Sequence, residues 1–260
     1  MTKRRALGQH FLRDGAIGRA IVDLVAPTAR DLVVEIGPGE GALTGTLAGR
    51  AGRVIALEVD PALGAALRAR LPTVEVLDAD ARTWDYAQLA APTGGRVLIV
   101  GNLPYSVGKP ILAALIGART AIHEMALMLQ REVAERVAAP PGGKTYGSLS
   151  VFTQLHCDVR VALRVPPGAF RPPPQVESSV LHLRVLQAPR VPLADERRFE
   201  TVVRAAFAQR RKMLANALGA GLGLPLEAVR RAAAAAGIDP TRRAETLSLL
   251  EFAALTAELS

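Results

Sequence analysis

Four residues at the end of a short apolar run have the groups needed to hold an amino group of a nucleobase. Asn102-Leu103-Pro104-Tyr105 follows the run Val97–Val100. The amide oxygen of Asn102 can accept one N–H of the amine. The carbonyl of Leu103 can accept the other, because Pro104 biases the residue before it toward an extended conformation. Tyr105 supplies an aromatic face on which an unpaired or flipped base can stack.

Such a site suits methyl transfer to an exocyclic adenine amine. The amine is a poor nucleophile because its lone pair is delocalised into the ring, and holding both N–H groups lets the lone pair turn toward an electrophilic methyl. No strong general base is needed, since the amine becomes acidic as it gains the methyl, so most of the catalysis is positioning. Asn and Pro are also ordinary turn-formers, so the motif alone leaves a simple turn open.

A glycine-rich loop earlier in the chain predicts a cofactor site. Glu35-Ile36-Gly37-Pro38-Gly39-Glu40-Gly41 follows an apolar run and opens a predicted helix, and glycine there lets the backbone approach a ligand closely. Glu58, at the end of the next predicted strand, can accept both hydroxyls of a ribose. Gly37, Gly39 and Ala42 also fit the loose dinucleotide fingerprint. The loop therefore fits a nicotinamide enzyme, a methyltransferase or a tight turn without a ligand.

A second acid favours the methyltransferase. Asp80 follows the predicted strand Val74–Leu77, where a carboxylate can accept a hydrogen bond from the amino group of a cofactor adenine. Asp78 is the competing candidate, and either acid can be a helix N-cap. The order of glycine-rich loop, Glu58, Asp80 and Asn102 predicts S-adenosyl-L-methionine as the cofactor.

These motifs lie at the ends of elements that alternate along the chain. Four short buried strands are predicted at Leu32–Ile36, Arg53–Leu57, Val74–Leu77 and Val97–Val100, with helices such as Gly41–Gly49 and Pro61–Leu71 between them. This alternation predicts an α/β fold with a mostly parallel, Rossmann-like sheet. A further strand, Ala121–Leu129, precedes a helix from Gln130 to Ala138.

The end of the sheet and a second domain follow. Leu149–Val165 and Ser178–Leu186 are predicted as a closing antiparallel pair joined by the proline-rich turn Pro166–Pro174. After a linker the pattern is helical only, with helices predicted at Glu196–Leu218, Pro225–Ala236 and Ser248–Leu259. We therefore predict a catalytic, cofactor-binding domain over residues 1–187 and a small helical domain over residues 188–260.

Composition limits the remaining choices. The formal charge of +8 favours a polyanion such as nucleic acid as partner. Cys157 is the only cysteine, which excludes an internal disulfide and a cysteine zinc cluster, so we expect a buried thiol and no metal site. The longest uncharged run, Met213–Leu226, is too short to span a bilayer, and Met1–Leu12 lacks the apolar stretch of a secretory signal. A cytoplasmic protein with no membrane association is expected.

Ordered segments along nearly the whole chain carry a resemblance to a known family. They are Gly8–Leu12, Glu35–Gly41, Glu58–Asp60, Asp80-Ala81, Asn102–Tyr105, Met128–Val133, Tyr146–Ser150, Val165–Pro174, Ala206–Lys212 and Ile238–Glu245. With these segments the chain resembles the ribosomal RNA adenine dimethyltransferase family, in particular its bacterial small-subunit members. The resemblance implies a class I methyltransferase sheet, and a monomer is expected.

The resemblance also implies site residues and a substrate. Cofactor contacts fall on His10, Leu12, Gly37, Glu58, Asp80 and Asn102. The implied reaction is dimethylation of the N6 amino groups of two adjacent adenosines in a hairpin loop near the 3′ end of 16S rRNA, within an assembling small ribosomal subunit. Phe170 is similar to a second aromatic wall for the target base, with a core aromatic as the alternative. His10 stands where the family usually has Asn, and Ser106 stands where Asn is common.

Basic residues of the helical domain are candidates for RNA contact. Arg204, Arg210, Arg211 and Lys212 are predicted to cluster within two turns of one helix. A solvated helix face explains such a run as well as an RNA footprint does. Three other functions stay open: a large-subunit rRNA adenine methyltransferase, a factor that mainly binds the immature subunit, and a nicotinamide oxidoreductase.

Overall fold

The computed structural model of the protein describes residues 10–259. Gly8 and Gln9 of the first matching segment therefore lie outside the described residues. The chain divides into two compact units, one of residues 1–134 and 158–185 and the other of residues 135–157 and 186–260. Between residues 10 and 259 no helix is long and apolar enough to cross a membrane.

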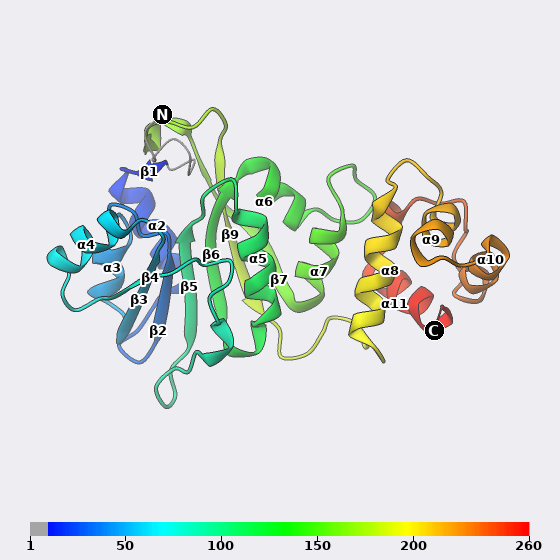
Figure 1. The fold of residues 1–260 in the computed structure, drawn as a ribbon, viewed down its shortest axis with the longest axis horizontal. Helices are drawn as coiled ribbons and strands as arrows, with labels where there is room; N and C mark the ends of the chain where they lie inside the picture. Colours follow the sequence, from blue (N-terminus) through cyan, green and yellow to red (C-terminus); the bar gives the residue numbers. More distant parts are fainter. Residues whose placement is uncertain (1–9, 260) are drawn as a thin grey trace. The chain divides into compact units, whose positions relative to one another are not determined.

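The first unit is built on a seven-stranded sheet with the strand order β4-β3-β2-β5-β6-β9-β7 (Figure 1). Its strands are β2 (Leu32–Ile36), β3 (Arg53–Glu58), β4 (Glu75–Asp78), β5 (Val97–Asn102), β6 (Glu124–Gln130), β7 (Cys157–Val165) and β9 (Ser178–Val185). The strands from β4 to β6 pair in parallel, and β9 runs antiparallel to β6. The predicted Rossmann-like sheet with an antiparallel closing strand is confirmed.

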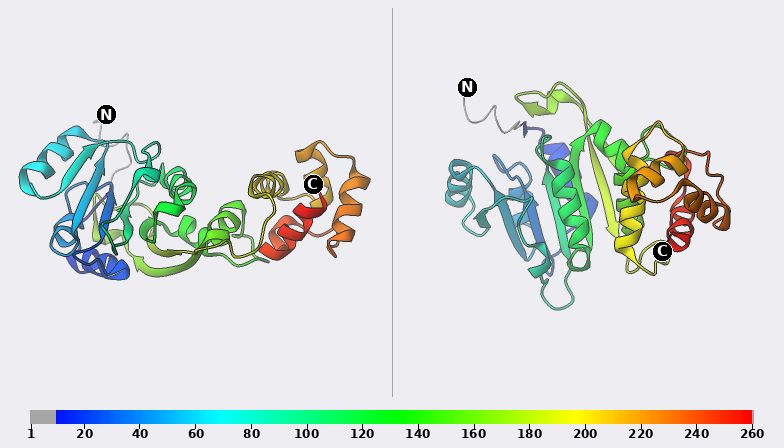
Figure 2. Two further views of the ribbon diagram at one scale, coloured as in Figure 1. Left: turned by 90° about the horizontal axis from the view of Figure 1, so that it is seen from below. Right: turned by 45° about the vertical axis from the view of Figure 1, so that its right-hand side comes forward.

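Helices cover both faces of this sheet. α2 (Gly15–Val25) and α3 (Thr44–Ala48) lie on one face, and α5 (Gly108–Gly117) lies on the other (Figure 2). This follows from right-handed crossovers, because the chain moves in opposite directions along the sheet from β2 to β3 and from β5 to β6. The strand order therefore reverses between β2 and β5, where α/β sheets bind ligands.

The remaining elements of this unit are short. α4 (Pro61–Arg70) begins with Asp60 as N-cap, and α6 (Arg131–Ala138) follows β6 and continues into the second unit, which begins at Glu135. Three 3₁₀ turns span Tyr86–Gln88, Arg119–Ala121 and Pro167–Ala169. The two-residue strands β1 (Phe11–Leu12) and β8 (Phe170–Arg171) pair antiparallel in a separate small sheet that the sequence did not predict.

The prediction of one long strand over Leu149–Val165 is wrong in its first half. Ser148–His156 forms the helix α7, and the strand β7 begins only at Cys157. The apolar residues Val151 and Leu155 lie four positions apart and are both buried, so they share one face of a helix. Cys157 is buried, as expected.

The second unit is helical, but its first predicted helix is also wrong. Glu196–Leu218 is split into α8 (Glu196–Ala208) and α9 (Leu214–Leu222). The break is stabilised from outside, because the backbone N–H of Leu214 donates to the carbonyl of Arg242 over 2.7 Å. The other elements are α10 (Leu226–Ala235), the 3₁₀ turn Ala244–Thr246 and α11 (Leu249–Glu258).

The second unit also includes a segment that the sequence placed with the catalytic domain. Residues 135–157 belong to it, although the predicted boundary lay at 187/188. Tyr146, Val151 and Leu155 are fully buried in the same apolar cluster as Phe199 and Phe252. Burial of the apolar face of α7 against the helical core explains the difference.

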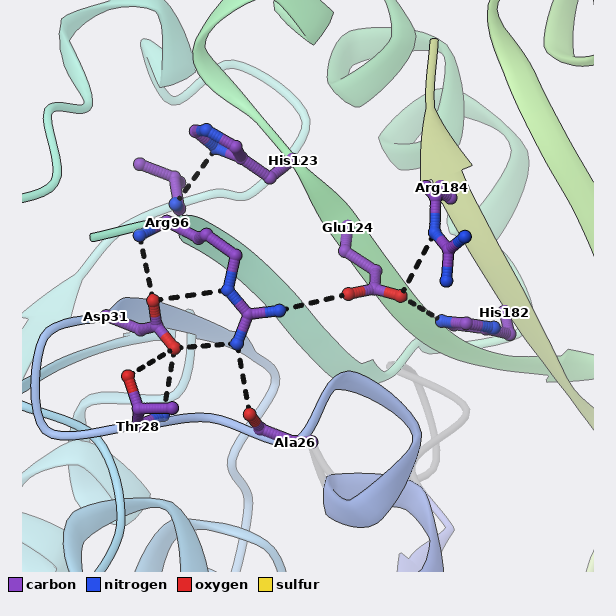
Figure 3. A network of polar contacts seen from close by, with 9 residues as sticks. Ala26, Thr28, Asp31, Arg96, His123, Glu124, His182 and Arg184 are labelled. Carbon is purple, nitrogen blue, oxygen red and sulfur yellow. Dashed lines mark hydrogen bonds and ion pairs between the residues drawn. The ribbon is translucent and has the colours of Figure 1, made fainter. Parts of the chain in front are cut away.

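A polar network joins the amino ends of the central strands (Figure 3). Asp31, just before β2, accepts a hydrogen bond of 2.8 Å from the guanidinium of Arg96, just before β5. Arg96 lies 3.4 Å from Glu124 at the start of β6, and Glu124 in turn lies 2.6 Å from the imidazole of His182 on β9. β2, β5, β6 and β9 are thus tied together at the edge of the sheet away from the carboxyl ends of the parallel strands.

Candidate active site

A cavity of about 310 Å³ opens where the carboxyl ends of the parallel strands meet. All the predicted cofactor residues and the four residues of the Asn-Leu-Pro-Tyr motif line it, namely His10, Leu12, Gly37, Glu58, Asp80, Asn102, Leu103, Pro104 and Tyr105. The fold brings these residues together because β2, β3, β4 and β5 each end at this edge.

The glycine-rich loop after β2 requires its glycines. The φ values of this loop are +65°, +55° and +80° at Gly37, Gly39 and Gly41. Residues other than glycine rarely adopt such a backbone conformation. A Cβ atom on Gly39 would lie 2.8 Å from the ring of Phe11, and one on Gly37 would lie 3.3 Å from the carbonyl oxygen of Asn102. The loop therefore runs close to both the β1 segment and the end of β5.

Glu58 at the end of β3 is held by backbone amides. Its side chain is buried, and it accepts hydrogen bonds of 3.0 Å from the N–H groups of Gly39, Val59 and Asp60. Burial raises the pKa of Glu58, while these three donors oppose the rise. One carboxylate oxygen accepts only the Gly39 bond, so it keeps a lone pair for a ribose hydroxyl.

The structure separates the two candidate acids, Asp78 at the end of β4 and Asp80 after it. Asp80 lines the cavity, and its carboxylate accepts from the backbone N–H and the guanidinium of Arg82 over 2.9 and 2.5 Å. Hydrogen bonds from Arg82 lower the pKa of Asp80 and keep it ionised. Asp78 instead pairs with Arg68 on α4 over 2.6 Å.

Glu35 is a cavity-lining residue to which the sequence analysis gave no role. Its side chain is 1% exposed, its Oε2 atom has no hydrogen-bond partner, and burial raises its pKa to about 8. An acid within an otherwise apolar buried strand was the available signal. S-adenosyl-L-methionine carries ammonium, hydroxyl and amino groups that donate hydrogen bonds, so the acceptor oxygens of Glu35, Glu58 and Asp80 fit this cofactor.

The amide of Asn102 has a defined orientation. Its Nδ2 atom donates to the backbone carbonyl of His10 over 2.9 Å. A carbonyl only accepts hydrogen bonds, so the amide nitrogen must face His10, and the oxygen Oδ1 faces away from that contact. Leu103 continues the pairing with β6, because its N–H donates to the carbonyl of Met128 over 3.0 Å.

Tyr105 is held at both its ring and its hydroxyl. The hydroxyl lies 2.5 Å from Oγ of Ser178, which begins β9 at the same edge of the sheet. The ring of His10 lies 5.4 Å from the ring of Tyr105, between centroids, with 32° between the ring planes. Burial raises the pKa of Tyr105, so the phenol stays neutral at physiological pH.

Phe170, the second aromatic residue predicted beside the target base, lies in the core and not in the cavity. Phe170 is 4% exposed, does not line the cavity, and packs in the same apolar cluster as Leu12 and Ala169. The structure therefore gives this ring to the core, which was the alternative interpretation.

The predicted RNA-facing residues do not form one helical patch. Arg204 on α8 lies over the ring of Phe152 at 4.8 Å. Arg210 donates to the carbonyl oxygens of Lys144 and Tyr146, so it stabilises the break after α8. Arg211 and Lys212 lie in that break and are exposed.

Comparison with known proteins decides the family. The family model described as ribosomal RNA adenine dimethylase matches residues 1–260. The chain belongs to the ribosomal RNA adenine dimethylase family. As predicted, it is therefore an S-adenosylmethionine-dependent RNA methyltransferase. This excludes the nicotinamide oxidoreductase suggested by the loop alone.

Similar members of the family are known in bacteria. A protein of Geobacter metallireducens named ribosomal RNA small subunit methyltransferase A is 46% identical over 258 residues, covering 97% of this chain and 94% of the relative. One of the same name from Moorella thermoacetica is 46% identical over 269 residues, covering 100% of this chain and 93% of the relative.

Two solved structures share the dimethylase fold over nearly the whole chain. A dimethyladenosine transferase from Plasmodium falciparum has a TM-score of 0.78 at 24% identity and covers 95% of this chain and 96% of that chain. The 23S rRNA methyltransferase ErmE has a TM-score of 0.73 at 27% identity and covers 96% of this chain and 99% of that chain.

Proposed function

We propose that the protein dimethylates the N6 amino groups of two adjacent adenosines in a hairpin loop near the 3′ end of 16S rRNA. The identity of 46% to proteins named for the small ribosomal subunit, against 27% to a 23S rRNA enzyme, supports the choice of RNA. We further propose that it acts in the cytoplasm, as a monomer, on an assembling small subunit.

The contact between Asn102 and His10 carries the proposed chemistry. Because Nδ2 of Asn102 is held by the His10 carbonyl, Oδ1 is the atom available to accept an N–H of the target amine. The carbonyl of Leu103 accepts the second N–H. With both N–H groups held, the nitrogen lone pair turns out of conjugation and toward the methyl donor.

Tyr105 positions the base, with its ring face against the adenine and its hydroxyl on Ser178. S-adenosyl-L-methionine, when bound, supplies a methyl group on a positively charged sulfur. Glu58 would hold the ribose, Asp80 would accept from the cofactor's adenine amino group, and Glu35 would accept from its ammonium group. Gly37 allows the loop to approach closely, and His10 and Leu12 close the cavity from β1. No metal enters this proposal.

The ribosome-facing role falls to the second unit. Arg211 and Lys212 are exposed and offer cations to phosphates. Arg204 and Arg210 contribute mainly by shaping the surface, since both contact the helical unit itself.

Mass mapping of methylated RNA tests the proposal. The protein is incubated with methyl-labelled cofactor and either small-subunit particles lacking the modification or large-subunit RNA. We expect two neighbouring dimethyladenosines near the 3′ end of 16S rRNA and no product on large-subunit RNA. Product only on large-subunit RNA would overturn the choice of substrate, and particle binding without methylation would support an assembly factor.

A further inference from the structure

His10 contacts the catalytic motif and the proline-rich turn at the same time. Its backbone carbonyl accepts from Nδ2 of Asn102 over 2.9 Å, and its imidazole Nδ1 lies 2.8 Å from the carbonyl oxygen of Pro172. Its ring also lies beside that of Tyr105, at 5.4 Å between centroids. His10 therefore contacts two parts of the chain that are far from it and from each other in sequence.

His10 lies at the end of the small sheet formed by β1 and β8, where its backbone bonds Asn102. The pairing of β1 with β8 runs from Leu12 and Phe170 to Phe11 and Arg171, so His10 and Pro172 lie just beyond it. Proline has no N–H, so Pro172 offers only its carbonyl to a hydrogen bond. Beyond the paired residues, the carbonyl of His10 accepts from the amide of Asn102, and the carbonyl of Pro172 is bonded by the imidazole.

The proton on the imidazole is assigned by this partner. The carbonyl of Pro172 only accepts hydrogen bonds, so Nδ1 of His10 must carry a proton. The side chain therefore extends a two-residue strand pair by one more bond. Such a short pair is easily frayed, so this bond fixes where the His10 carbonyl lies.

We propose that His10 is a positioning residue for methyl transfer, and that its imidazole sets the orientation of the Asn102 amide. The inference rests on the proposed function, because it assumes that Oδ1 of Asn102 holds the target amine. It differs from a simple cofactor contact, since the imidazole nitrogen that the structure shows engaged is bonded to Pro172. Losing the imidazole should slow the chemical step more than it weakens cofactor binding.

Two substitutions at His10 separate positioning from packing. His10→Leu keeps much of the volume but removes the donor, and we expect kcat to fall by about 10-fold to 100-fold, as for a small misplacement of reacting groups. The Kd for S-adenosylmethionine should change by less than about threefold, because binding and chemistry are separable effects. His10→Asn restores a donor and should recover part of the rate. His123→Leu, at an exposed histidine outside the cavity, is the matched control and should keep kcat unchanged.

The imidazole itself gives a readout that does not depend on activity. Long-range ¹H–¹⁵N spectra of the protein with labelled histidine should show His10 protonated at Nδ1, unlike a free neutral imidazole that exchanges between tautomers. An unchanged kcat for His10→Leu, or a neutral ring protonated only at the other nitrogen, Nε2, would overturn the inference. If the unsubstituted protein methylates no small-subunit RNA, the proposed function fails, while the spectrum still decides the role of the imidazole.

Discussion

Strand β2 has a buried acid near each end, and the protein treats the two acids in opposite ways. Asp31 precedes the strand and is 2% exposed, while Glu35 lies near its carboxyl end and is 1% exposed. Asp31 accepts hydrogen bonds from the backbone and side chain of Thr28 and of Arg96. The Oε2 atom of Glu35 has no hydrogen-bond partner.

The pKa values of the two acids move in opposite directions. Burial alone would raise the pKa of Asp31, but the guanidinium of Arg96 and the surrounding N–H groups outweigh it and hold the pKa below its usual value. Burial raises the pKa of Glu35 to about 8. A buried acid whose oxygens all have hydrogen-bond partners stabilises the fold. A buried acid that lines a cavity and has an oxygen without a partner indicates where a ligand supplies the missing hydrogen bond.

The largest expected effect lies at the cavity end. Asn102→Ala removes the acceptor for the target amine and should lower kcat by about 10³-fold, or about 4 kcal/mol. The melting temperature and binding to small-subunit particles should stay near those of the unsubstituted protein. Methyl transfer and particle pull-down measure the two effects. Asn216→Ala, at the chain's other asparagine, should leave both unchanged. Lost particle binding in Asn102→Ala would contradict the role given to this residue.

At the opposite edge we expect the reverse, a loss of stability without a loss of chemistry. Asp31→Ala leaves Arg96 without its main partner and should lower the free energy of unfolding by about 3 kcal/mol. The lower end of the usual range applies because the Arg96 side chain is 37% exposed. Urea unfolding measures the change, and kcat of the folded variant should be unaffected.

The exposed pair of Asp23 and Arg50 provides the matched control for this loss. Asp23→Ala should cost less than about 1 kcal/mol, since the Asp23 side chain is 59% exposed. Equal losses for Asp31→Ala and Asp23→Ala would show that the network of Figure 3 contributes no more than a surface ion pair.

The two acids should also give opposite dependences of stability on pH. Folded Glu35 keeps its proton up to about pH 8, while in the unfolded chain it ionises near 4.5, so the folded state binds more protons in that window. The free energy of unfolding should therefore fall as pH rises from 5 to 8, by up to about 1.4 kcal/mol per pH unit. The stabilisation from Asp31 is present above its unfolded pKa of 3.8 and is lost as pH falls below it.

Glu35→Gln isolates the first of these dependences. Unfolding in urea at several pH values should show that the free energy of unfolding of the variant, relative to that of the unsubstituted protein, increases steadily from pH 5 to pH 8. A difference that does not change with pH would mean that Glu35 is already ionised in the folded protein at pH 5.

The parts of the site that the sequence predicted share a physical reason. Gly37, Glu58, Asp80 and Asn102 each lie at or just after the carboxyl end of a parallel strand, and local order along the chain is enough to bring such positions to one edge. The bond from His10 to Pro172 spans 162 residues and has no local signature. The helix α7 was missed because a short apolar run suits a strand and a buried helix equally well.

The smallest expected effect concerns a hydrogen-bonded pair at the cavity end of the sheet, Tyr105 and Ser178. The hydroxyl of Tyr105 and Oγ of Ser178 lie 2.5 Å apart, and Ser178 is fully buried. Tyr105→Phe keeps the ring for stacking and removes only this bond. We expect kcat/KM to fall by about 2-fold to 10-fold, which corresponds to one hydrogen bond of about 0.5–1.5 kcal/mol.

Ser178→Ala breaks the same bond from the other side, so the two changes form a double-mutant cycle. If the bond acts only by fixing the ring, the double variant should be no slower than the slower single variant, because the second change removes nothing further. Methylation rates at limiting RNA measure all four proteins. Losses that simply add would mean that the hydroxyl of Tyr105 and Ser178 act separately. The ring of Tyr105 would then be positioned mainly by its packing against His10. Asp31, at the other end of the sheet, is held instead by its hydrogen bonds.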